Sequence, residues 1–185
     1  YGNSTDPHDP DSEDDGMPDG WELENNFDPN SDADNETDVD SDTLINVYEY
    51  GNNTNPRESD TDNDGMPDGW ETNNTLDPLN DDTLEDPDGD LLENIYEYGN
   101  STDPHDPDSE DDGMLDGWEL EYNFDPNSDA DNETDADGDG VLNVYEYGNS
   151  TNPRNSDSDG DTLNDFEELV THGTDPNSQD TESDG

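Results

Sequence analysis

Twelve-residue segments of one pattern, D-x-D/E-x-D-x-Φ-x-D/N-x-x-E with Φ apolar, recur seven times in this chain. They begin at Asp11, Asp38, Asp60, Asp86, Asp108, Asp135 and Asp157, and we number them loops 1 to 7 in that order. Positions 1, 3, 5, 9 and 12 carry side-chain oxygens, and position 7 can contribute its backbone carbonyl. This spacing wraps a short backbone around one hard cation with six to eight oxygen ligands, as Ca²⁺ requires. The repetition therefore predicts seven calcium-binding loops.

The predicted ligands occupy positions 1, 3, 5, 7, 9 and 12 of each loop, and position 12 is always Glu. They are Asp11, Glu13, Asp15, Met17, Asp19, Glu22; Asp38, Asp40, Asp42, Leu44, Asn46, Glu49; Asp60, Asp62, Asp64, Met66, Asp68, Glu71; Asp86, Asp88, Asp90, Leu92, Asn94, Glu97; Asp108, Glu110, Asp112, Met114, Asp116, Glu119; Asp135, Asp137, Asp139, Val141, Asn143, Glu146; and Asp157, Asp159, Asp161, Leu163, Asp165, Glu168. Where Asn replaces Asp at position 9, we expect some loss of charge but no change in geometry, because that position often binds through water.

The composition favours a metal array over other acidic proteins. The chain has 59 acidic and 2 basic residues, a net charge of −57 and only 21% hydrophobic residues. Without cations such a chain cannot bury enough apolar surface to offset its ordering entropy. Nucleic acids and anionic membranes would repel it, so neither is an expected partner. The acids are in register with apolar residues and glycines, unlike those of a halophilic surface or a solvated tail.

Several other classes are excluded or disfavoured. The chain contains no cysteine, so disulfides and thiolate metal sites are excluded. No apolar stretch is long enough to cross a membrane. No nucleophile–base pair or phosphate-binding loop stands out, so we expect no enzymatic activity. The three histidines lie beside Pro or Gly without a zinc-like spacing, and we interpret them as surface residues.

The loops belong to a longer repeat. Self-comparison divides residues 1–185 into one array with units 1–49, 50–97, 98–146 and 147–185, of which the last is divergent and truncated. Each full unit holds a loop with Trp at position 11 (Trp-type, loops 1, 3 and 5) and a loop with Tyr there (Tyr-type, loops 2, 4 and 6). The predicted fold is a calcium-stapled array of irregular loops and short α-helical turns. We expect an elongated solenoid or rod with little or no β-sheet and no single hydrophobic core.

The last third of each loop is predicted to start a helix. Asp19-x-x-Glu22 and its copies fit the capping-box pattern, in which the two side chains bind each other's backbone N–H groups. The glycines at Gly51, Gly99 and Gly148 are predicted to end the helices as left-handed caps.

Position 6 needs a sharp turn that favours glycine. Four loops have Gly there, whereas loops 2, 4 and 7 have Thr43, Leu91 and Thr162. We expect the backbone of those three loops to be strained.

Apolar and aromatic residues recur at positions 7 and 11. The aromatic residues at position 11 are Trp21, Tyr48, Trp70, Tyr96, Trp118 and Tyr145. Because their period follows the metal motif, we expect them to pack between successive loops. A ladder for binding carbohydrate is the alternative.

Acceptor sequons for N-glycosylation provide a second signal. They lie at Asn3, Asn35, Asn52, Asn73, Asn100, Asn132 and Asn149. Four of them follow the Gly that is predicted to end a helix, on turns that suit a glycan. Duplication can also copy one accidental sequon, so the sequence leaves open whether glycans are attached.

Asp60 to Glu71, together with the connecting Thr-Asp-Pro element, resembles the thrombospondin type 3 repeat in its cysteine-free microbial form. The loops are EF-hand-like, and dockerins share them. The resemblance covers essentially the whole chain and implies an extracellular or cell-surface, calcium-rich, elongated protein used as a stalk, spacer or filament section. The sequence leaves open whether chains self-associate into a filament. It also implies that the acids outside the loops, Asp32, Asp34, Asp129 and Asp131, hold further ions. The alternative function is a calcium-dependent adhesion or carbohydrate-binding module.

Overall fold

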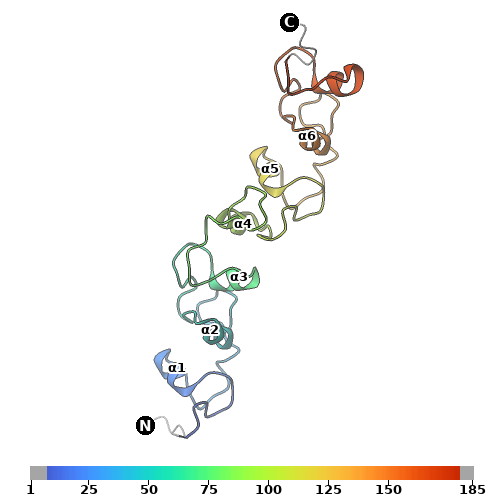
Figure 1. Ribbon diagram of the computed structural model, residues 1–185. Coiled ribbons are helices and arrows are strands. Elements are labelled where there is room, and N and C mark those ends of the chain that lie inside the picture. The colour runs from blue at the N-terminus through green and yellow to red at the C-terminus, as the bar shows by residue number, and fades with distance from the viewer. Residues whose placement is uncertain (1–7, 180–185) are drawn as a thin grey trace. The chain divides into compact units, whose positions relative to one another are not determined.

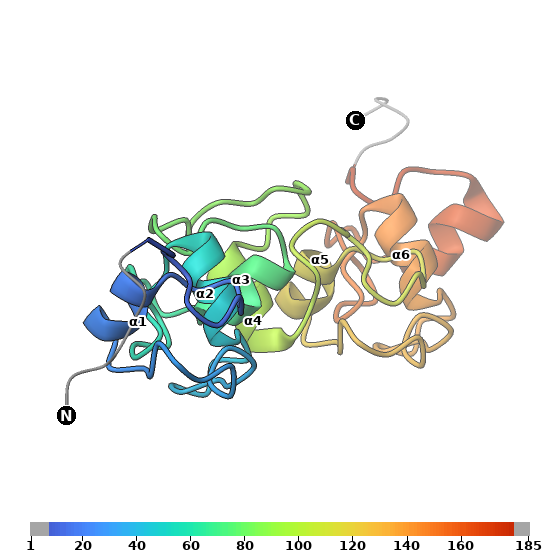
Figure 2. The same ribbon diagram turned by 90° about the horizontal axis from the view of Figure 1, so that it is seen from below.

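The structure is a computed structural model that describes residues 8–179. The chain divides into two compact units, Tyr1–Glu85 and Asp86–Gly185, and the boundary lies inside the second sequence repeat. In both units short helices alternate with open loops (Figures 1 and 2). No strand occurs among the described residues. The predicted fold of loops and short helices without β-sheet is thereby confirmed for residues 8–179.

Every α-helix begins at position 9 of a loop, as the sequence predicts. The first unit contains α1 (Asp19–Glu24), α2 (Asn46–Asn52) and α3 (Asp68–Asn73). The second unit contains α4 (Asn94–Asn100), α5 (Asp116–Glu121), α6 (Asn143–Asn149) and a π-helical turn, η1 (Glu167–His172), at the end of loop 7. Each loop therefore delivers its position-12 Glu from the first turn of a helix.

The predicted capping boxes are absent from these helices. Helix α1 starts after Pro18 with no side-chain bond to its N-terminus. The Asp19 carboxylate instead accepts hydrogen bonds from the backbone N–H and the hydroxyl of Ser12, both at 2.8 Å. The Glu22 carboxylate is fully buried and has no hydrogen-bond partner. The prediction was wrong because both side chains are directed into the loop instead of the helix end.

The helix C-termini also differ from the prediction. Gly51 lies inside α2, and Gly99 and Gly148 lie inside α4 and α6. The left-handed residue comes two positions later, at Asn53 (φ 63°) and at the corresponding serines. The chain then turns back so that the N–H of the fifth residue after the loop Glu bonds that Glu's carbonyl.

The buried apolar side chains come one per loop. Among the described residues, and apart from prolines between the loops, the buried hydrophobic side chains are those at position 7 of loops 1 to 6: Met17, Leu44, Met66, Leu92, Met114 and Val141. Leu163, at position 7 of loop 7, is half-buried. No single core is formed in this part of the chain, as predicted. Each loop is closed around its own apolar residue.

Trp21 and Trp118 pack against other aromatic rings as predicted, whereas the Tyr residues at the same loop position are exposed. The ring of Trp21 lies 5.7 Å from that of Phe27 and 5.4 Å from that of Tyr50. Tyr48 and its counterparts in loops 4 and 6 are 58–62% exposed. The packing prediction is therefore wrong for the Tyr-type loops. Tyr50, two residues after Tyr48, makes the contact with Trp21 instead.

Candidate metal centres

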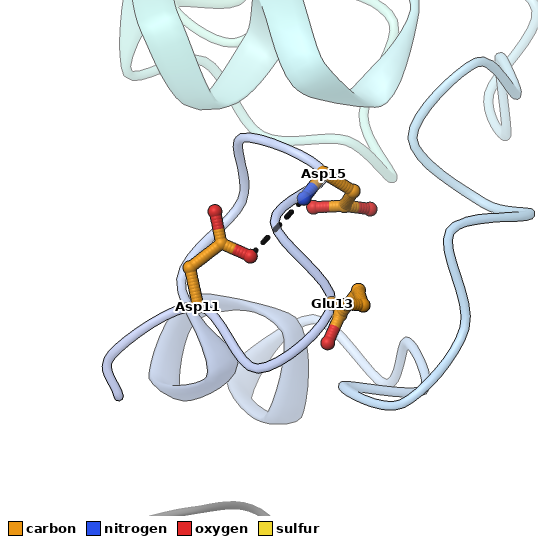
Figure 3. Close-up of side chains that lie close together, drawn as sticks. All are labelled: Asp11, Glu13 and Asp15. Atoms are coloured by element: carbon orange, nitrogen blue, oxygen red, sulfur yellow. Dashed lines mark hydrogen bonds between the residues drawn. The ribbon is translucent and has the colours of Figure 1, made fainter. Parts of the chain in front are cut away.

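Hydrogen bonds from the backbone shape every loop in the same way. In all seven loops, one carboxylate oxygen at position 1 accepts from the N–H of position 6, and one at position 5 accepts from the N–H of position 7. In loop 1 these are the Asp11–Gly16 and Asp15–Met17 bonds, at 3.1 and 2.8 Å. Figure 3 shows Asp11, Glu13 and Asp15 around one turn of this loop, with Asp11 also accepting from the Asp15 N–H at 3.2 Å.

The turn at position 6 has a left-handed backbone in every loop. The glycines there have φ between 96° and 106°, and Thr43, Leu91 and Thr162 have φ of 81°, 79° and 91°. Non-glycine residues in this region are strained by roughly 1–3 kcal/mol each. The predicted strain in loops 2, 4 and 7 is confirmed.

The oxygens at positions 3 and 12 share one property in all seven loops. At least one carboxylate oxygen of each residue is buried and has no hydrogen-bond partner in the protein. These residues are Glu13, Glu22, Asp40, Glu49, Asp62, Glu71, Asp88, Glu97, Glu110, Glu119, Asp137, Glu146, Asp159 and Glu168. The position-12 glutamates are at most 1% exposed. Buried carboxylates without partners are costly, so a repeated arrangement of this kind needs a compensating cation.

The pKa values of these carboxyl groups show the same cost. Burial, together with the nearby carboxylates of Asp64 and Asp62, raises the pKa of Glu71 to about 9. Burial, with Glu110 beside it, raises the pKa of Glu119 to about 10. At position 3, burial raises the pKa of Asp40 to about 6. A divalent cation among such groups would reverse the shifts, because it favours the ionised form.

The donor set fits a hard cation. Carboxylate oxygens of Asp11, Glu13 and Asp15 lie within 4.8 Å of one another, and so do those of Glu13, Asp19 and Glu22. Carboxylates and carbonyls are the ligands of Ca²⁺ and Mg²⁺, whereas zinc and copper sites use imidazole or thiolate. The residues that the sequence predicts as ligands are thus brought together in loop 1. The acids at positions 1, 3 and 5 of loop 2 converge in the same manner.

The two loop types hold their position-12 Glu differently. In loop 2 the hydroxyl of Thr54 donates to Glu49 Oε1 at 3.2 Å, and the equivalent Thr does so in loops 4 and 6. In Trp-type loops both Glu oxygens lack a partner, because the residue at that place is Phe or Leu. Sequence reasoning missed these threonines. The recurring Thr-Asp/Asn-Pro element carried the signal.

An acidic residue from outside the twelve-residue segment lies beside the Trp-type loops. Oxygens of Asp15, Glu22 and Asp34 lie within 4.8 Å of one another. Asp34 Oδ1 is buried without a partner, as is Oδ1 of Asp131, the equivalent residue of loop 5. The Glu of a Trp-type loop therefore faces two groups of carboxylates, one within its loop and one that includes the later acid. Asp32 and Asp129 come close enough to raise the pKa of the position-5 Asp, after burial and other nearby groups.

Asn at position 9 has a role that Asp could not fill. The Asn46 amide group donates to the carbonyl of Asp34 at 2.8 Å and to the Thr37 hydroxyl at 2.9 Å. Its Oδ1 is buried without a partner and remains free to act as a ligand. The expectation that Asn only lowers the charge was incomplete, since the amide also ties loop 2 to the segment before it.

The sequons lie in three settings, and glycosylation stays a prediction. Asn3 lies outside the described residues. Asn35 and Asn132 are half-buried and donate to the carbonyls of Asp15 and Asp112 at 3.2 and 3.1 Å. Asn73 is exposed. The remaining three, Asn52, Asn100 and Asn149, are the last residues of helices, and each amide donates to the helix carbonyl four residues earlier.

Comparisons with known proteins do not assign a family. No protein-family model matches the chain, and no curated protein or solved structure was found to match it. None of the described helices has the length and apolar character needed to cross a membrane. The interpretation of the site therefore depends on its residues and geometry.

Proposed function

We propose that the chain is a calcium-binding structural protein whose fold is held by Ca²⁺ in its seven loops. The observation that carries this proposal is the pair of buried, unpartnered carboxylates at positions 3 and 12 of every loop. A chain with so few apolar residues has no other source of stabilisation of comparable size. The small core of one buried side chain per loop agrees with this.

Calcium is favoured over magnesium by the type of ligand. Each loop offers five side chains and a carbonyl, and EF-hand-like loops of this length commonly use a bidentate Glu at position 12. Mg²⁺ requires near-ideal octahedral geometry and dehydrates reluctantly, so it suits such a cage poorly. We further propose one extra ion at each Trp-type loop, between its Glu and the later acid, which is Asp34 in loop 1 and Asp131 in loop 5.

The proposed biological role is a non-catalytic stalk, spacer or filament section of an extracellular or cell-surface protein. Calcium modules outside cells bind in the range of about 10⁻⁴–10⁻³ M, where constant occupancy serves structure and not signalling. Loops that contact mainly their neighbours would give an elongated array, and this shape and any self-association are testable by small-angle scattering with and without Ca²⁺. Glycans, if present, should avoid Asn35 and Asn132, because their amides bond the position-5 carbonyl of a loop 20 residues earlier, whereas those of Asn52, Asn100 and Asn149 bond only their own helix.

Ion counting tests the proposal directly. Native mass spectrometry of the calcium-loaded chain should give at least seven bound Ca²⁺, and circular dichroism in chelator should show loss of structure that Ca²⁺ restores and Mg²⁺ restores poorly. A chain that binds no Ca²⁺, or that is equally structured in chelator, would reject the proposal.

The exposed tyrosines favour one alternative function. Tyr48, Tyr96 and Tyr145 are 61%, 58% and 62% exposed at the same place in successive Tyr-type loops. Exposed aromatic rings can stack on sugars, which would fit a calcium-dependent adhesion or carbohydrate-binding module. A glycan that changes tyrosine fluorescence of the calcium-loaded chain, and fails to do so after all three are replaced by Ser, would support that function.

A further inference from the structure

One group of buried carboxylates is shared between two loops. Asp42 and Glu49 belong to loop 2, whereas Asp68 is the position-9 residue of loop 3. Oxygens of the three side chains lie within 4.8 Å of one another, and the residues are 5%, 0% and 0% exposed. Glu49 Oε2 is buried and has no hydrogen-bond partner. Loop 2 therefore meets an acid that the sequence assigns to its neighbour.

A close backbone contact fixes Asp68 at this place. The N–H of Gly69 donates to Asp42 Oδ2 at 3.0 Å. A Cβ atom on Gly69 would lie 2.3 Å from the Asp42 carbonyl oxygen, so no larger residue fits there. The Asp68 carboxylate is also held by the N–H and hydroxyl of Thr61, at 2.7 and 2.6 Å. These two bonds use one lone pair on each oxygen and leave the others available to an ion.

The same junction occurs at two other places. The Gly117 N–H donates to Asp90 Oδ2 at 2.8 Å, and the Phe166 N–H donates to Asp139 Oδ2 at 3.1 Å. The residue just before each donor is a fully buried Asp, Asp116 or Asp165. In each case the preceding loop is Tyr-type, with Asn instead of Asp at its own position 9.

The junction that leads into loop 2 is built differently. There position 9 is Asn46, and its amide bonds the carbonyl of Asp34 instead of facing a carboxylate of loop 1. In loops 3, 5 and 7 the position-9 Asp thus lies near the position-12 Glu of the preceding Tyr-type loop, whereas the position-9 Asn of loop 2 bonds a backbone carbonyl. A divalent cation is the natural bridge between three buried carboxylates, since they repel one another without it.

We propose that Asp68, Asp116 and Asp165 each bind the ion of the preceding Tyr-type loop in addition to the ion of their own loop. This inference depends on the proposed function. Each of these residues would supply a negative ligand that the Asn at position 9 of the Tyr-type loop lacks. Because one carboxylate serves two ions, the first ion to bind orders a ligand of the second. The loop pairs 2 and 3, 4 and 5, and 6 and 7 should therefore take up calcium cooperatively.

Asp68→Asn and Asp19→Asn are matched tests of this proposal. Both alter position 9 of a Trp-type loop, but Asp19 follows no other loop among the described residues. NMR amide signals that follow each loop during a Ca²⁺ titration would report each site separately. We expect Asp68→Asn to weaken binding in loop 2 and in loop 3, each by about tenfold or more, because even outer-shell partners of metal ligands contribute 10–100-fold. Asp19→Asn should weaken loop 1 alone.

Gly69→Ala and Gly20→Ala form a second pair, and neither substitution removes a ligand residue. A Cβ on Gly20 would meet no atom within 4 Å. We expect Gly69→Ala to separate the titrations of loops 2 and 3, which coincide in the wild type, and Gly20→Ala to leave them coincident. Unchanged binding in loop 2 of Asp68→Asn, or coincident titrations in Gly69→Ala, would overturn the shared ligand. A wild-type chain whose loops do not respond to Ca²⁺ at all would instead reject the proposed function.

Discussion

Removal of divalent cations at neutral pH should unfold this chain, and the buried glutamates give the magnitude. Burial raises the pKa of Glu22, Glu49, Glu97 and Glu146 from 4.5 to about 8, and the values for Glu71 and Glu119 are higher still. At pH 7 each such group costs the folded state about 3 kcal/mol relative to the unfolded chain, because it must take up a proton on folding. Six together cost roughly 20 kcal/mol, which exceeds the 5–15 kcal/mol by which domains are typically stable.

The sign of the pH dependence follows from the raised pKa values. The pKa of Glu49 is 4.5 in the unfolded chain and about 8 in the folded chain. Between pH 4.5 and pH 8 the folded state therefore binds more protons at Glu49 and its equivalents than the unfolded state does. Without cations, stability should therefore fall as pH rises through this window and return on acidification. With calcium the dependence should be opposite, because protons displace the metal from its carboxylates.

Circular dichroism and tryptophan fluorescence across pH 4 to 8, in chelator and in excess Ca²⁺, would measure both trends. Glu119→Gln should stabilise the chelated chain by about 3 kcal/mol, since it removes one ionisation cost. Glu121→Gln, an exposed residue on the same helix, makes the same charge change and should have little effect. Full structure in chelator at pH 7, or greater order at pH 7 than at pH 4 without cations, would refute the reasoning.

Three further outcomes are expected. In native mass spectrometry, Glu119→Gln should lower the number of bound calcium ions by two and Glu146→Gln by one, because only the Glu of a Trp-type loop faces two clusters of carboxylates. Equal losses would contradict the second cluster. Thr54→Val should weaken calcium binding in loop 2 by about 10-fold or more without changing the count at saturation, since it frees the ligand it orients; calorimetry would show this. Arg57→Ala should lower stability by about 1–2 kcal/mol and speed hydrogen exchange in α1, because its guanidinium lies 5.0 Å from the Phe27 ring centroid and bonds the α1 C-terminus.

The spacing of acids predicted the loop interiors well because the determinants are local. The Glu at position 12 is only eleven residues from the first acid of its own loop, and the helix that begins at position 9 lies in the same segment. The capping-box prediction failed for a related reason. Asp19 and Glu22 have the same spacing in a capping box and in a metal loop, so the pattern alone could not decide between them. The buried position of Glu22 decides for the loop.

Contacts between loops could not be read from spacing. Asp34 reaches Glu22 across a turn of the chain, and the Asp42–Gly69 bond joins residues 27 positions apart. Neither is implied by the loop pattern, because the pattern fixes ligands within a loop and not the side on which the next loop packs. The hydrogen bond from Thr54 to Glu49 was missed for the same reason, since Thr54 lies outside the twelve-residue segment.

Position 6 of one loop and position 10 of the next are matched in size where the two loops meet. In loop 2 a Thr occupies the strained position 6, and a Cβ on Gly69 of the next loop would lie 2.7 Å from the Thr43 hydroxyl oxygen. Loops 1 and 6 have a glycine at position 6, Gly16 and Gly140, and the next loop has Val47 or Phe166 at position 10. A Cβ atom on Gly16 would lie 3.3 Å from the Val47 side chain, and a Cβ atom on Gly140 would lie 3.3 Å from the Phe166 side chain. A bulky residue at one of the two positions is thus matched by glycine at the other. A loop with Thr at position 6, such as loop 2, could therefore not be followed by a loop with Val at position 10, whereas loop 6, which has Gly140 at position 6, accepts Phe166.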